Sequence, residues 1–126
     1  MVKQVESRVI YTYTPGGIGV YTNSFDFTFS NISFIPDYMV IKSITVFNNG
    51  AVTNAVILRS NLFNSYLPML AINITNSYTM GLNIRYPMNK SINGTYTFEF
   101  IDITTGGLIV NLPLFGLAIN VEFVKE

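Results

Sequence analysis

The stretch NGTYTFEFIDITTGG, residues 93–107, contains a turn, a strand and a second turn, and it decides the fold class. Asn93-Gly94 and Gly106-Gly107 favour turns because glycine readily adopts positive φ, so the residues between them run extended. By the two-residue period of a strand, Tyr96, Phe98 and Phe100 share one face. The face that carries these rings is predicted to point into the core.

After Phe100 the apolar pattern changes phase, because Ile101 and Ile103 fall on the face opposite the rings. A β-bulge would produce this slip, since one extra residue moves all later side chains to the other face. Burial of both faces near the end of the strand would produce it equally well. The sequence leaves both interpretations open.

Composition predicts one domain that spans residues 1–126 and folds around a single core. A chain of 126 residues has the usual domain length, and 49% of the residues are hydrophobic, with ten Phe and eight Tyr. The chain has no Cys and no His, which excludes disulfides, thiolate nucleophiles and His-based zinc or Ser-His sites. We therefore predict no cofactor and no enzymatic activity.

The charged residues are few and balanced. Seven Lys and Arg offset seven Asp and Glu, and charged residues make up only 11% of the chain. The basic residues are scattered along the sequence, which gives no basic patch for nucleic acid. A surface with so little charge does not keep free monomers apart by repulsion, so we expect part of it to be hidden in a homo-oligomer.

The sequence shows no export signal and no membrane span. The first seven residues, MVKQVES, lack an apolar signal core. The longest apolar run, residues 112–119, contains Pro113 and Gly116 and is too short to cross a bilayer.

Short strands follow one another along the whole chain. Phe25, Phe27 and Phe29 alternate with polar residues, whereas residues 38–47 are nearly continuously apolar and predict a central strand. The remaining strands are predicted at residues 8–14, 52–59, 70–75, 80–86, 95–103 and 119–124, with a loop at 60–68. No helical period is present, so the fold class is all-β, and the spacing favours an eight-stranded jelly-roll β-sandwich.

Two segments of the closing third resemble the ends of single jelly-roll capsid proteins. They are PMNKSINGTYTFEF, residues 87–100, and INVEFVK, residues 119–125. The resemblance is to the small penton or minor capsid proteins of double-stranded DNA viruses that infect protists, such as virophages and polinton-like viruses. It implies a structural subunit of the virion, assembled inside the host cell. Its partners would be copies of itself, commonly in a pentamer at the vertex, and other capsid proteins.

The same Gly-x-Tyr-x-Phe pattern, here Gly94, Tyr96 and Phe98, is similar to one in trimeric jelly rolls of the tumour-necrosis-factor and C1q type and in viral fibre heads. The alternative function is therefore a trimeric head module that binds a receptor or a carbohydrate. A small carbohydrate-active enzyme is a third and weaker alternative.

Carboxylates are the only candidate catalytic groups. A glycosidase needs two of them across a cleft, and Glu99 and Glu122 lie on strands that could be neighbours. Both occupy the polar phase of an alternating strand, where a carboxylate faces water. Asp37 and Asp102 are near turns and are more typical of turn formation than of calcium binding. We assign no catalytic, cofactor or metal residue.

Two sets of residues are candidates for binding. A sugar platform would use tyrosines, although core edges and subunit contacts explain them better. These are Tyr11, Tyr13, Tyr21, Tyr66, Tyr78 and Tyr86. Apolar residues in or beside predicted loops mark the expected subunit interface. They are Leu67, Pro68, Met69, Leu112, Pro113, Leu114 and Phe115.

Overall fold

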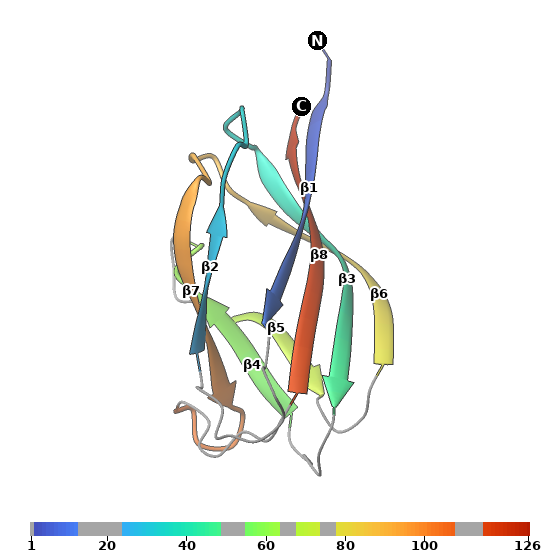
Figure 1. Cartoon of the computed structure of the whole chain (residues 1–126), viewed down its shortest axis with the longest axis vertical. Helices are drawn as coiled ribbons and strands as arrows, with labels where there is room; N and C mark the ends of the chain where they lie inside the picture. The colour runs from blue at the N-terminus through green and yellow to red at the C-terminus, as the bar shows by residue number, and fades with distance from the viewer. Residues whose placement is uncertain (1, 13–23, 49–54, 64–67, 74–77, 108–114) are drawn as a thin grey trace.

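Two four-stranded antiparallel sheets face each other in the computed structural model (Figure 1). The structure describes all residues except 1, 13–23, 49–54, 64–67, 74–77 and 108–114. Every regular element within the described residues is a strand. The strands are β1 (Gln4–Thr12), β2 (Ser24–Phe29), β3 (Tyr38–Asn48), β4 (Ala55–Ser60), β5 (Pro68–Asn73), β6 (Tyr78–Pro87), β7 (Gly94–Asp102) and β8 (Phe115–Lys125). The prediction of an all-β sandwich is confirmed.

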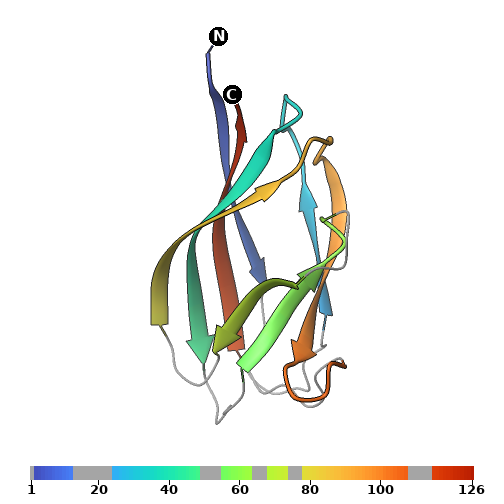
Figure 2. The ribbon, with the colours of Figure 1, turned by 180° about the vertical axis from the view of Figure 1, so that it is seen from behind.

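Sheet A has the strand order β1-β8-β3-β6, and sheet B has the order β2-β7-β4-β5. Figure 2 shows the two layers from behind, with β4 and β5 toward the viewer. The first and last strands are neighbours, with Gln4 opposite Lys125 and Thr12 opposite Leu117. Strand β3 lies between β8 and β6, which confirms the prediction that residues 38–47 form a central strand.

The core lies between the sheets and is rich in aromatic rings. Phe29 of sheet B meets Phe123 of sheet A edge to face, with 5.2 Å between the ring centroids. Phe98 of β7 is fully buried and stacks on Phe25 of its neighbour β2 at 5.2 Å. Because rings from both sheets interdigitate, their burial holds the two layers together.

Strand β7 resolves the phase slip seen in the sequence. It pairs with β2 and with β4 without any shift of register, so the slip is not a bulge. Phe100 is 2% exposed and Ile101 is 6% exposed, although they point to opposite faces. Burial on both faces near the end of the strand is therefore the correct interpretation, and Ile103 beyond it is exposed.

Several strand boundaries differ from the sequence prediction, among them the starts of β1, β5 and β8, the last of which begins at Phe115 rather than at residue 119. Strand β1 begins at Gln4 rather than at residue 8, because β8 is long enough to pair with the extra residues. Strand β5 begins at Pro68, which the sequence analysis placed in a loop. Proline is tolerated there because β5 is an edge strand and Pro68 is its first residue, where the missing N–H breaks no inner ladder.

Candidate functional site

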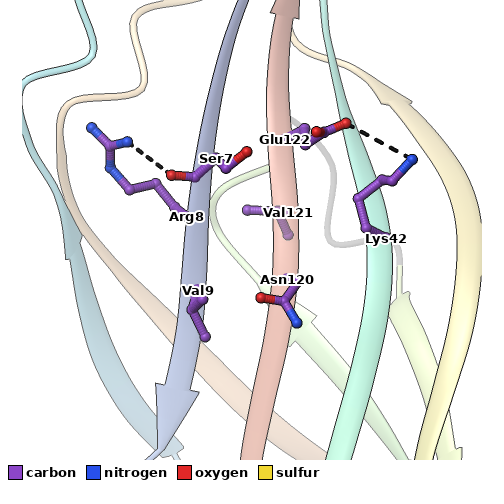
Figure 3. Close-up of a pocket in the computed structure, with 7 residues that line it drawn as sticks. All are labelled: Ser7, Arg8, Val9, Lys42, Asn120, Val121 and Glu122. Carbon is purple, nitrogen blue, oxygen red and sulfur yellow. Dashed lines mark hydrogen bonds and ion pairs between the residues drawn. The ribbon is translucent and has the colours of Figure 1, made fainter.

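A shallow hollow of about 480 Å³ lies on the outer face of sheet A, across β1, β8 and β3 (Figure 3). It is a candidate site because polar side chains from three strands gather around it. The residues that line it are Ser7, Arg8, Val9, Lys42, Asn120, Val121 and Glu122.

The floor of the hollow follows from the alternation of β8. Val121 and Phe123 are buried in the core, so Asn120 and Glu122 must project from the other face of the strand. Opposite them on β1 stand Val9 and Ser7. The outer face of these two strands is therefore a mixed polar and apolar surface.

A β-bulge in β3 supplies the cation of the site. Relative to β8, β3 has one extra residue between Ile41 and Ser43, and this residue is Lys42. The inward positions of β3 accordingly change from Met39 and Ile41 to Ile44, which are all buried. The change of apolar phase from odd to even numbers was visible in the sequence, but the sequence analysis took it for continuous burial.

The polar groups of the hollow are engaged with one another. Lys42 Nζ lies 3.9 Å from Glu122 Oε1, and Asn120 Nδ2 donates to Ser43 Oγ at 2.7 Å. The side chains of Lys42 and Glu122 are 48% and 33% exposed, so water screens this ion pair. One carboxylate beside one ammonium group leaves this part of the hollow without net charge.

Arg8 crosses from β1 to the end of β2. Its Nη1 donates to Glu6 Oε2 at 2.7 Å and to the Ser7 carbonyl at 2.9 Å, and its Nη2 donates to the Ser30 carbonyl at 3.1 Å. The guanidinium thus covers the open edge between the two sheets. Figure 3 shows that its bond to Ser7 lies on the side of β1 away from β8.

A small apolar cluster on the same outer face lies beyond the hollow, toward the chain termini. It consists of Tyr38, Val40 and Val124, which are at most 7% exposed. Arg85 lies over the Tyr38 ring at 3.9 Å from its centroid, and the Tyr38 hydroxyl donates to Glu126 Oε1 at 2.7 Å. The hydrogen bond to Glu126, followed by burial, raises the pKa of Tyr38. The cluster anchors the ends of β3 and β8 and offers no reactive group.

The two carboxylates considered for catalysis do not meet. Glu99 lies between the buried Phe98 and Phe100 of sheet B, and it pairs with Arg59 on β4 at 3.2 Å. Glu122 faces outward from sheet A. The sandwich core separates the two groups, so a two-carboxylate glycosidase site cannot form from this pair.

The candidate calcium residues accept hydrogen bonds from backbone N–H groups, Asp102 within its own turn and Asp37 from the residue that follows β8. Asp102 Oδ1 accepts from the Thr104 N–H at 2.8 Å and from Thr104 Oγ1 at 2.5 Å, and these bonds lower the pKa of Asp102. Asp37 Oδ2 accepts from the Glu126 N–H at 2.9 Å. Within the described residues, no three acidic side chains gather as a metal site would require.

The two candidate tyrosines whose side chains the structure describes do not lie on one shared surface. Tyr11 is on β1 and packs edge to face on Phe27, whereas Tyr86 is on β6 and packs on Phe63 at 4.8 Å. Strands β1 and β6 are the opposite edges of sheet A. Tyr13, Tyr21 and Tyr66 lie outside the described residues, as does the side chain of Tyr78.

Most of the predicted interface residues cannot be placed. Leu67, Leu112, Pro113 and Leu114 lie outside the described residues. Pro68 and Met69 belong to β5 and Phe115 begins β8, so these three lie in strands at loop boundaries. Their side chains are not described, and their role in an interface stays a prediction.

An apolar stripe runs along β1 that was not predicted from the sequence. Val5, Val9 and Tyr11 lie on the outer face and are 45%, 43% and 56% exposed. They alternate with residues of the inner phase, which ends in the fully buried Ile10. The signal was present as valines two residues to either side of Ser7, but residues 4–7 had not been assigned to a strand.

Comparisons with known proteins assign this chain to no family. No family model matches the sequence, and no curated protein matches it either. The chain is similar to the solved Drosophila NLP-core, whose structure is described as giving insight into pentamer formation and histone binding. Identity is 12%, the TM-score is 0.48, and the match covers 98% of this chain and 99% of that one. A likeness this distant carries no argument about fold or function. Within the described residues, no helix is long and apolar enough to cross a membrane.

Proposed function

We propose that this chain is a non-enzymatic structural subunit of a virus particle, built as a single jelly roll and located in the virion. It would act as a penton or minor capsid protein that joins copies of itself and other capsid proteins through strand edges and loops. A pentamer is the favoured assembly.

The strand pairing is the observation that carries the proposal. Strands β1 and β8, β2 and β7, β3 and β6, and β4 and β5 are all antiparallel neighbours. This is the order expected when one long hairpin of eight strands is rolled into two sheets, which is the jelly-roll pattern of many capsid subunits. The order supports the fold that the sequence resemblance implies.

The surface is also suited to assembly. Few charges cover it, and an apolar stripe runs along the outer face of the edge strand β1. An edge strand presents unpaired backbone N–H and C=O groups, to which another chain can add. Apolar side chains beside such an edge favour burial by a protein partner over contact with water.

Native mass spectrometry and negative-stain electron microscopy of the purified chain test the proposal. We expect closed rings of five subunits. A stable trimer would instead favour the head module that binds a receptor or a carbohydrate, and a glycan array would then follow. A chain that stays monomeric at all concentrations would contradict both functions.

A further inference from the structure

The edge of β1 has a self-complementary sequence. Within sheet A, β1 pairs only with β8, so its other edge is not part of any ladder in the described residues. Its outer face carries Val5, Ser7 and Val9, and its inner phase carries Glu6 and Arg8. The two charges and the two valines are each placed symmetrically about Ser7.

We propose that β1 pairs antiparallel with β1 of a second copy of this chain, with Ser7 opposite Ser7 on a two-fold axis. The two A sheets then form one continuous eight-stranded sheet. This contact rests on the proposed assembly but does not close its ring of five, because a two-fold contact uses the same surface on both copies and a ring needs two different surfaces. It would join subunits of two neighbouring rings.

Charge fixes the register of the contact. With Ser7 on the axis, Glu6 of each copy stands opposite Arg8 of the other, on the same face of the sheet. An axis at residue 6 would place Glu6 of one copy opposite Glu6 of the other. An axis at residue 8 would place Arg8 of one copy opposite Arg8 of the other. Like charges directly opposite are destabilising, so only the register centred on Ser7 pairs both charges.

The outer face agrees with the same register. Val5 of one copy lies opposite Val9 of the other, so four half-exposed valines become cross-strand pairs around the axis. Shifting the axis by a single position would replace these apolar pairs by mixed ones. The two valines of the apolar stripe are thereby covered by the same two valines of the second chain.

The backbone can make the contact in this register. Figure 3 shows the Ser7 carbonyl directed away from β8, toward the free edge, where Arg8 bonds to it. In the pair, this carbonyl accepts the Ser7 N–H of the second copy. Arg8, which covers this edge in the single chain, must then leave the Ser7 carbonyl, and it exchanges its bond to Glu6 of its own chain for one to Glu6 of the other. The number of ion pairs is unchanged, a ladder bond replaces the Arg8 bond at the Ser7 carbonyl, and the contact gains the covered valines.

Engineered cysteines test the register, because the chain contains no native cysteine. Residues opposite each other in an antiparallel ladder have Cα atoms about 4.5–5.5 Å apart, within the range of about 4.4–6.8 Å that a disulfide spans. We expect Ser7→Cys to form a covalent dimer on mild oxidation. The matched control is Val9→Cys, whose two thiols would be about 14 Å apart along the strands and should not link.

A mixture gives a second readout of the same register. Val5→Cys and Val9→Cys should each stay uncrosslinked alone and should form a heterodimer when combined. If Ser7→Cys links no faster than Val9→Cys, or if the mixture does not link, the proposed register is wrong.

Charge reversal tests the ion pairs without covalent chemistry. Glu6→Arg or Arg8→Glu alone should weaken self-association roughly tenfold or more, because two attractive pairs become two repulsive ones. Mixing the two variants should restore association, since each charge then meets its opposite in the other chain. If the substitutions act only through the Glu6–Arg8 ion pair within a single chain, mixing the two variants would not restore association. That result would refute the contact.

The outcomes separate this inference from the proposed function. If rings persist in all β1 variants and Ser7→Cys does not link, the assembly stands and the β1 contact fails. If the unmodified chain never associates, both fail.

Discussion

Truncation of Phe123 probes the contact between the two sheets most directly. Its ring is fully buried, and it meets Phe29 of the opposite sheet at 5.2 Å and an interplanar angle of 87°. Phe→Ala changes in a core cost about 3–5 kcal/mol, through lost burial and the cavity that remains. We expect Phe123→Ala to lower the free energy of unfolding by about that amount, which is much of the stability of a typical domain.

Urea unfolding followed by circular dichroism measures this loss. With a slope of about 2 kcal/mol per molar urea, a loss of 4 kcal/mol moves the midpoint down by about 2 M. Because a loss of this size leaves little stability to measure in a marginal domain, the milder variants Phe123→Leu and Phe29→Leu and their double variant form a cycle. We expect a coupling of about 0.5–1.5 kcal/mol for the edge-to-face pair.

The control for this experiment is the next residue along β8. Glu122→Gln faces outward and should change stability by less than about 1 kcal/mol, because exposed ion pairs contribute little. Equal effects at positions 122 and 123, or a coupling near zero between positions 29 and 123, would refute the inward orientation of the rings.

Three further predictions concern the loops at the sheet ends. Asn93→Ala should cost about 1–3 kcal/mol in urea unfolding, because its amide accepts from the Ile32 N–H at 3.0 Å and donates to the Ile32 carbonyl at 2.9 Å. Thr104→Val should raise the pKa of Asp102 toward its ordinary value in an NMR titration, and the remaining bond from the Thr104 N–H should keep it below that value. Asn89 has a φ of 55°, so Asn89→Gly should keep or slightly raise the melting temperature, whereas Asn89→Val should lower it.

The sign of the Asp102 effect determines its pH dependence. Because folding lowers the pKa of this carboxyl group, its contribution to stability is present above the ordinary pKa. The contribution is lost as the pH falls through the folded-state pKa. Thr104→Val should therefore reduce stability at neutral pH and have no such effect in strong acid, while Thr105→Val should leave the pKa of Asp102 unchanged.

The sequence predicted the parts of the fold that local alternation determines. The rings at positions 25, 27 and 29 and at 98 and 100 face the core because a strand alternates every second residue. The central position of β3 was predicted for the same kind of reason, since both of its faces are apolar near Tyr38 and Ile41.

The pairing of strands that are distant in the chain could not be predicted from the sequence. Glu99 and Glu122 have the same local pattern, and only the assignment of β7 and β8 to different sheets separates them. The hollow on sheet A joins residues 7–9 to residues 120–122, more than a hundred positions apart. No local sequence pattern indicates which distant strand will lie alongside, because the register between distant strands depends on the whole topology.

The state of association of the unmodified chain tests the central claim, that this sandwich completes its surface with further copies of itself. Sedimentation velocity over a wide concentration range measures it. We predict species several times heavier than the 14.1 kDa chain, increasing with concentration. A single 14.1 kDa species at every concentration would contradict the account.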